Sequence, residues 1–153
     1  MSNLLGEYEC KLDSKGRVKV PSALIRQFPA EAGGCFVINR GFEQHLVLYP
    51  KNEWEKITAE IDNLNHYNRQ TREFRRFFYR GATELIIDGS ERLLLPKSLM
   101  DWAKISKDII LFAHTNMVEI WDKALYSNLL SDEPEDFANL AENVLGSKKE
   151  NVD

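Results

Sequence analysis

The chain has 153 residues, of which 43% are hydrophobic and 29% charged, and its formal net charge is −4 at pH 7. This composition is typical of a globular protein with a buried core, and it excludes wholesale disorder. No run of eighteen apolar residues occurs, which predicts that no helix spans a membrane, and an N-terminus without a basic and apolar leader predicts a cytoplasmic protein.

The negative charge is unevenly distributed along the chain. Residues 131–153 hold seven acidic side chains against two lysines, whereas residues 1–130 carry a small positive excess. Two segments, 11–26 and 69–80, each hold five basic residues and a single acidic one. Because attraction to a phosphate backbone depends on local charge, the total of −4 does not exclude a nucleic acid as a partner.

The first half of the chain predicts short strands, a sharp turn and helices. In chain order, strands are expected at 7–12, 18–20, 35–39 and 46–49, and helices at 22–28 and 51–64. The turn between the first two strands lies at 13–17, where Asp, Ser and Gly favour it. Pro21 ends the second strand and suits the first turn of the helix that follows.

The second half repeats this order of elements. A shift of 75 residues places Asp13 on Asp88 and Arg17 on Arg92, and a shift of 72 aligns the later strands. Its expected strands lie at 84–87, 93–95, 109–113 and 117–121, and its helices at 97–103 and 123–130. Each copy is too small to bury its own faces, so copies must pack together, either as two halves of one chain or between neighbouring chains.

Two segments lie outside the repeated units. Residues 69–80 place Phe74 and the phenylalanines three and four residues later on one face of a helix, with arginines around them. We interpret the aromatic face as structural and the arginines as ligands for acidic groups at an interface. A weaker amphipathic helix is expected over 137–145, ended by Gly146. The acidic tail either shields the basic surface or is a solvated terminal helix.

The sequence predicts a protein that is not an enzyme and that binds no cofactor and no metal. The three histidines have no nucleophile or carboxylate at a diagnostic spacing, and no motif of a hydrolase, metalloprotease or phosphate-binding loop occurs. His45 and His114 fall in equivalent turns, and we interpret both as exposed turn residues. Cys10 and Cys35 follow no ligand spacing, which indicates buried thiols in a reducing compartment.

The repeated Asp-x-x-x-Arg turn has a structural and a functional interpretation. Asp13 and Asp88 are interpreted as turn-stabilising, because an Asp and an Arg that flank a hairpin turn can pair across it. That role does not explain the basic residues around the first turn. These share the parity of Arg17, so in extended strands they project together; they are Lys11, Lys15 and Lys19.

A two-stranded β-ribbon can carry such side chains into the major groove of DNA. Arg17 is the best candidate for a base-edge contact, because its planar fork can bond two acceptors. Lys11, Lys15 and Lys19 are interpreted as phosphate partners. The open alternatives are an oligomeric scaffold that does not bind DNA, in which the turns only stabilise hairpins, and a small hydrolase or transferase for which no site can be named.

The two motifs also carry a family resemblance. Leu12-Asp13-Ser14-Lys15-Gly16-Arg17-Val18-Lys19-Val20-Pro21, with Ile87-Asp88 and Arg92-Leu93-Leu94-Leu95-Pro96 in the second copy, resembles the MraZ family over about residues 5 to 130. The resemblance implies an α+β fold: a pseudo-two-fold tandem repeat of a swapped-hairpin AbrB-like β-barrel unit with short flanking helices. The first SpoVT-AbrB-like repeat is expected at 8–52, a connecting helical segment at 53–80, the second repeat at 81–125, and a C-terminal helix and acidic tail at 126–153.

The resemblance further implies a homo-oligomeric ring and a nucleoid-associated regulator, usually a repressor. Such a regulator binds double-stranded DNA at promoter-proximal direct repeats upstream of the division and cell-wall operon that includes its own gene. Carried over by position, Gly16, Arg17 and Arg92 belong to the two DNA-binding turns. The chain departs from the family pattern at Glu91, where a glycine commonly precedes the arginine. An acid beside Arg92 repels phosphate, so we expect the first copy to contact DNA and the second to serve packing and assembly.

Overall fold

The structure is a computed structural model that describes residues 3–131 and 137–150. The chain divides into a main unit that ends at Lys123 and a C-terminal unit that begins at Ala124. The strands of the main unit are β1 (Leu4–Lys11), β2 (Arg17–Lys19), β3 (Cys35–Arg40), β4 (Leu46–Pro50), β5 (Thr83–Ile86), β6 (Arg92–Leu94), β7 (Asp108–Thr115) and β8 (Met117–Asp122). Its helices are α1 (Ser22–Ile25), the 3-10 turn η1 (Ala30–Ala32), α2 (Lys51–Asp62), α3 (Arg69–Tyr79) and α4 (Lys97–Trp102). The predicted α+β class is confirmed.

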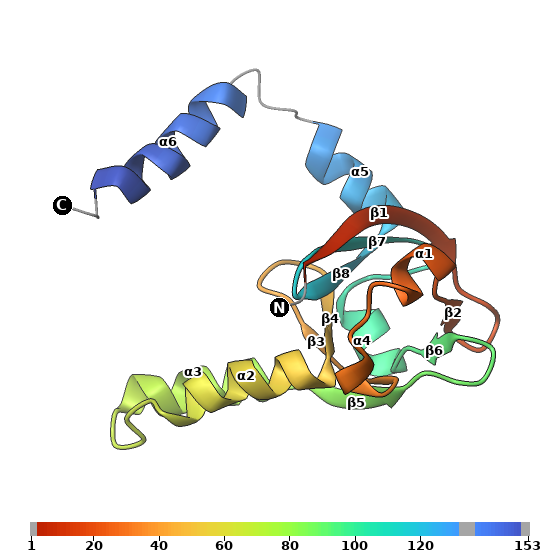
Figure 1. Cartoon of the computed structure of the whole chain (residues 1–153), viewed down its shortest axis with the longest axis horizontal. Helices are drawn as coiled ribbons and strands as arrows, with labels where there is room; N and C mark the ends of the chain where they lie inside the picture. Colours follow the sequence, from red (N-terminus) through yellow and green to blue (C-terminus); the bar gives the residue numbers. More distant parts are fainter. Residues whose placement is uncertain (1–2, 132–136, 151–153) are drawn as a thin grey trace. The chain divides into compact units, whose positions relative to one another are not determined.

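The two halves of the chain are interleaved in one sheet. Six strands lie in the order β1-β7-β8-β4-β3-β5, every neighbouring pair antiparallel, while β2 and β6 form a separate antiparallel pair. The first strand of each half therefore pairs with the third strand of the other half, β1 with β7 and β5 with β3 (Figure 1). The halves of one chain complete a common core, which is one of the two arrangements that the sequence left open.

The core is built from equivalent positions of the two copies. Val18 and Leu93 are each 1% exposed, and the equivalent helices α1 and α4 insert Leu24 and Leu99 into the same cluster. Pro21 and Pro96 stand directly before these helices, at their N-caps. Helix α1 is shorter than predicted and ends at Ile25, with a turn from Arg26 to Phe28 before Pro29. Proline disfavours helical backbone in the residue before it, which accounts for the early end.

Helices α2 and α3 pack against each other and carry aromatic side chains between them. Trp54 of α2 stacks on Phe78 of α3 with ring centroids 5.6 Å apart, and Asp62 pairs with Arg75 at 3.1 Å. The phenylalanine face of 69–80, interpreted from the sequence as structural, is only partly covered. Phe78 is half-buried, but Phe77 is 65% exposed, and within the described part of the chain no residue of α3 is fully buried. The helix packs along α2 rather than under the sheet.

The interpretation of His45 as an exposed turn residue is wrong. Its side chain is buried and its ring stacks on Trp121 with centroids 4.3 Å apart. A Cβ on Gly41 would lie 2.3 Å from His45 Nε2, so the glycine makes room for the ring. Burial lowers the pKa of His45, against the opposing effect of the Glu119 carboxylate. His114 is half-exposed, and its Nε2 lies 2.8 Å from Glu119 Oε2.

The cysteines are half-buried rather than fully buried. Neither Cys10 nor Cys35 is in a disulfide in the part of the chain that the structure describes. Burial raises the pKa of the Cys10 thiol, with a smaller contribution from Glu9. A raised pKa favours the protonated thiol over the nucleophilic thiolate.

The C-terminal unit comprises α5 (Lys123–Ser131), whose first residue closes the main unit, and α6 (Phe137–Glu150). The prediction that Gly146 ends the last helix is wrong, because α6 continues to Glu150. Gly146 keeps a negative φ and does not adopt the left-handed conformation of a glycine cap. Residues 151–153 lie outside the described residues.

Candidate nucleic-acid interface

The first turn is held by the carboxylate of Asp13. The backbone N–H groups of Lys15 and Arg17 both donate to Asp13 Oδ1 at 2.9 Å, and Arg17 Nε donates to Asp13 Oδ2 at 2.8 Å. These contacts lower the pKa of Asp13 from 3.8 to about 2, chiefly through the backbone N–H of Arg17. The carboxylate therefore stays ionised and holds the Arg17 side chain through its Nε.

The second turn repeats the same network. Ser90 N and Arg92 N donate to Asp88 Oδ1 at 2.8 and 2.9 Å, and Arg92 Nε donates to Asp88 Oδ2 at 2.9 Å. The pKa of Asp88 is likewise lowered, chiefly by the backbone N–H of Arg92. The structural interpretation of the two aspartates as turn-stabilising agrees with this geometry in both copies.

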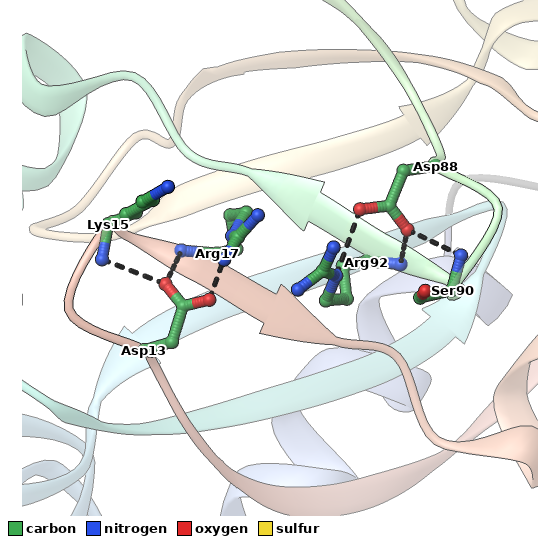
Figure 2. A network of polar contacts seen from close by, with 6 residues as sticks. All are labelled: Asp13, Lys15, Arg17, Asp88, Ser90 and Arg92. Atoms are coloured by element: carbon green, nitrogen blue, oxygen red, sulfur yellow. Dashed lines mark hydrogen bonds and ion pairs between the residues drawn. The ribbon is translucent and has the colours of Figure 1, made fainter.

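The pairing of β2 with β6 places both turns on one strand pair. Arg17 lies opposite Leu94, and Lys19 lies opposite Arg92. Figure 2 shows the turns at opposite ends of this strand pair, with Arg17 and Arg92 directed toward each other across its middle. The sequence predicted that the first turn joins its two flanking strands, 7–12 and 18–20, into a two-stranded ribbon. That ribbon is not formed, because β2 pairs with β6 and meets the first strand segment only through the isolated bridge Leu12↔Val18.

The four basic candidates of the first copy do not all lie on this strand pair. Lys15 is exposed in the turn itself, and Lys19 is exposed on β2 beside Arg17. Lys11 instead ends β1 in the six-stranded sheet, where its Nζ lies 3.8 Å from Asp108 Oδ1. The parity argument failed for Lys11 because the turn changes the chain from one sheet to the other.

The residue before each arginine has left-handed backbone in both turns. Gly16 has φ 82° and Glu91 has φ 61°. Glycine adopts this conformation without strain, whereas a residue with a Cβ pays about 1–2 kcal/mol. A Cβ on Gly16 would also lie 3.1 Å from Met100 Cε. The first turn is therefore relaxed at this position, with Met100 packed beside its glycine, and the second is strained and carries a carboxylate beside its arginine.

Each arginine retains hydrogen-bonding capacity. Within residues 3–131 and 137–150, the side-chain contacts of Arg17 and Arg92 are made through Nε alone. The two terminal nitrogens of each guanidinium can then bond a carboxylate, a phosphate or the acceptor edge of a base. A planar fork oriented in this way can form two parallel hydrogen bonds to one partner.

Leu94 is the residue of this face that the motif analysis missed. Leu94 is 54% exposed, whereas its neighbours Leu93 and Leu95 are buried. The repeat already contained the signal, because the shift of 75 residues that aligns the arginines places Leu94 on Lys19. Strand alternation then puts both residues on the solvent side.

Two further kinds of feature are absent from the described residues. No group of three or more His, Cys, Asp or Glu side chains there is arranged to hold a metal ion. No helix in the same residues is long and apolar enough to cross a membrane.

The fold and the site together define a class: a tandem-repeat α+β protein whose two halves exchange strands and place paired Asp-x-x-x-Arg turns on one strand pair. Residues 4–77 and 78–148 each match the family model described as "MraZ protein, putative antitoxin-like". The chain belongs to the MraZ family.

Similar proteins support this assignment over nearly the whole chain. A protein of Christiangramia forsetii is 44% identical over 148 residues, which cover 96% of each chain. A protein of Flavobacterium psychrophilum is 42% identical over 148 residues, 96% of this chain and 94% of its own. One of Cytophaga hutchinsonii is 40% identical over 144 residues, 94% of this chain and 95% of its own. Each of the three is named Transcriptional regulator MraZ.

Proposed function

We propose that this chain is a transcriptional regulator that binds double-stranded DNA sequence-specifically and acts as a repressor. Its sites would be short direct repeats upstream of the division and cell-wall operon that includes its own gene, which places it at the nucleoid. The observation that carries the proposal is the pair of arginines oriented by ionised aspartates on one exposed strand pair. The names of its relatives support the same class of function.

The first turn would make the sequence-specific contact. Arg17 is held at Nε, so its terminal nitrogens can bond O6 and N7 of a guanine in the major groove. Gly16 adopts the left-handed backbone of the turn without strain, which would keep Arg17 in position for that contact. Lys15 and Lys19 flank the arginine and would contact phosphates, with Lys11 a more distant phosphate partner on β1.

The second turn would contribute less to DNA affinity. Arg92 has the same orientation as Arg17, but Glu91 places a carboxylate beside it and Ser90 stands where the first copy has Lys15. Repulsion between Glu91 and the phosphates opposes the attraction of Arg92. In this proposal the second copy mainly supplies β6 as the partner of β2 and positions the first turn.

Assembly into a homo-oligomeric ring would supply the affinity that one chain lacks. A single copy offers few cations around its first turn, whereas specific binding commonly uses about six to ten phosphate contacts. Several linked turns on DNA repeats about one helical turn apart would raise avidity by about 10² to 10⁴. We further propose that residues 8–52 and 81–125 are the two SpoVT-AbrB-like repeats of a swapped-hairpin barrel, with 53–80 connecting them and 126–153 as the C-terminal segment.

Fluorescence anisotropy tests the proposal directly. A labelled duplex from upstream of the chain's own gene is titrated with the protein beside a scrambled duplex of equal length and composition, from about 50 to 200 mM salt. We expect tighter binding to the native duplex and a steep loss of affinity with salt. Equal binding to both duplexes would exclude sequence-specific regulation, and no binding to either would favour an oligomeric scaffold that does not bind DNA.

A further inference from the structure

The solvent face of the β2–β6 pair contains one apolar side chain among three cations. Val18 and Leu93 point into the core, each 1% exposed. Alternation along the two strands therefore turns the other side chains outward. These outward residues are Arg17, Lys19, Arg92 and Leu94.

Leu94 lies directly beside the arginine of the first turn. The backbone bonds from Leu95 N to Gly16 O and from Val20 N to Glu91 O mark hydrogen-bonded pairs, so the alternating pair Arg17↔Leu94 is a non-hydrogen-bonded one. Side chains in such a pair stand about 4.5–5.5 Å apart at Cβ. Leu94 is therefore the cross-strand neighbour of Arg17 on the solvent face of the pair.

The same comparison shows that the strand pair is not chemically symmetric. The pseudo-two-fold that relates Arg17 to Arg92 also relates Lys19 to Leu94. One arginine therefore has an apolar cross-strand neighbour and the other has a basic one. A ribbon with identical halves would bind DNA equally well in both directions, whereas this one presents a different end in each direction.

We propose that Leu94 is a specificity-determining residue that contacts the C5 methyl group of a thymine next to the base bonded by Arg17. The inference rests on the proposed function. In the major groove the thymine methyl is the apolar group that protein side chains read, through apolar contact. An exposed leucine beside a base-reading arginine fits that group and no phosphate. The contact also sets one direction of the ribbon on DNA, as direct repeats require.

The surroundings of Leu94 also fit a DNA groove. Leu94 lines an open cavity of about 940 Å³ together with residues 13–16 of the first turn, Lys97 and Lys107, and Arg17 stands outside this lining. The three lysines beside this cavity, Lys15 among them, would supply positive charge to a phosphate strand that passes next to the base edges. The acids on the same lining are Asp13, committed to Arg17, and Asp101, which lies 3.6 Å from Lys97.

Removing the methyl group from DNA tests the proposal without altering the protein. A duplex from upstream of the chain's own gene is prepared with each thymine replaced in turn by deoxyuridine, which differs only by that methyl. We expect the wild type to lose affinity by about fourfold at one position per repeat, the effect of burying about one methyl group. Leu94→Ala should bind the thymine and uracil duplexes alike at that position.

Two matched variants separate the proposal from other roles of Leu94. Ile86→Ala, which also shortens an exposed apolar side chain, should keep the uracil effect. Lys19→Ala should weaken binding to all duplexes equally.

If the wild type binds tightly but no uracil position matters, the proposal is overturned and the regulator function stands. If the wild type binds none of the duplexes, the proposed function itself fails. A change in oligomer size for Leu94→Ala with an unchanged uracil effect would make Leu94 an assembly contact.

Discussion

The first and second Asp-x-x-x-Arg turns have the same backbone and the same hydrogen bonds but different surroundings. Asp13 and Asp88 each accept two backbone N–H groups and one arginine Nε, at distances that agree within 0.1 Å. Around the first arginine stand Gly16 and Lys15, and around the second stand Glu91 and Ser90. The shared hydrogen bonds hold the chain in the same turn before β2 and before β6. The differing neighbours place the first arginine near a basic side chain and the second beside an acidic one.

The comparison is sharpest at the residue before each arginine. Both turns have left-handed backbone at this position, which is a glycine in the first turn and Glu91 in the second. The second copy tolerates strain and an acid at a position that would face DNA if both turns read it equally. This difference is the basis of our proposal that the first copy recognises DNA and the second supports it structurally.

The largest effect is expected where the two copies are equivalent. Leu24 and Leu99 occupy corresponding helices and are both almost fully buried in one cluster. Leu24→Ala and Leu99→Ala should each lower the free energy of unfolding by about 2–5 kcal/mol, through lost burial and the cavity left behind. Urea denaturation followed by circular dichroism should show one transition in both variants, because the halves share a core. Two separate transitions, of which only one moves, would contradict the common core.

Removal of the aspartates should separate the two copies in DNA binding. Asp13→Ala frees the guanidinium of Arg17 to rotate and should weaken binding to the upstream duplex by about tenfold, a loss within the range of one bidentate base contact. Asp88→Ala should have a smaller effect. Anisotropy titrations of both variants, with Asp13→Asn as a control that keeps one acceptor oxygen, measure the difference. Equal losses for the two alanine variants would mean that both turns read DNA.

Replacement of Glu91 should make the second turn resemble the first. Glu91→Gly removes a side chain from left-handed backbone and should stabilise the fold by about 1 kcal/mol, less the extra entropy of glycine in the unfolded chain. Glu91→Gln keeps the strain and removes only the charge, so it should leave stability unchanged and raise DNA affinity slightly. Thermal unfolding and anisotropy of the two variants measure strain and charge separately. A glycine variant that is less stable than the wild type would show that Glu91 makes a favourable contact.

The smallest effect is expected from pH. The pKa of Asp13 is lowered from 3.8 to about 2, and that of Asp88 is also lowered. For Asp13 this means that the stabilisation is complete above pH 3.8 and is lost as the pH falls through about 2, and for Asp88 the loss likewise begins only below pH 3.8. Arginine Nε resonances of the two turns should therefore stay fixed from pH 8 to about pH 4 in NMR spectra. Movement of these resonances near pH 4 or above would contradict the assigned network.

Local features of this chain could be predicted from its sequence because short-range chemistry determines them. Asp13 and Gly16 predicted the first turn, Pro21 and Pro96 predicted where helices begin, and the strands were placed within a few residues. The repeat also predicted that two copies share a core. Each of these depends on residues close together in the chain.

Pairing and burial could not be read in the same way. Short strands of similar alternation can pair with several partners, so nothing local shows that β2 pairs with β6 or that Lys11 belongs to another sheet. The burial of His45 depends on Trp121 from the other half of the chain and on the space above Gly41. Gly146 failed as a helix end because a glycine stops a helix only where the chain adopts the left-handed conformation.

The division of work between the two turns is tested most directly by the two arginines themselves. Wild type, Arg17→Ala and Arg92→Ala are titrated by anisotropy into a duplex from upstream of the chain's own gene across a salt series, with oligomer size measured by light scattering. We expect Arg17→Ala to lose about 10- to 100-fold in affinity, Arg92→Ala to lose less than about tenfold, and all three to assemble alike. Equal losses for the two variants, or a larger loss for Arg92→Ala, would contradict the assignment of DNA recognition to the first turn.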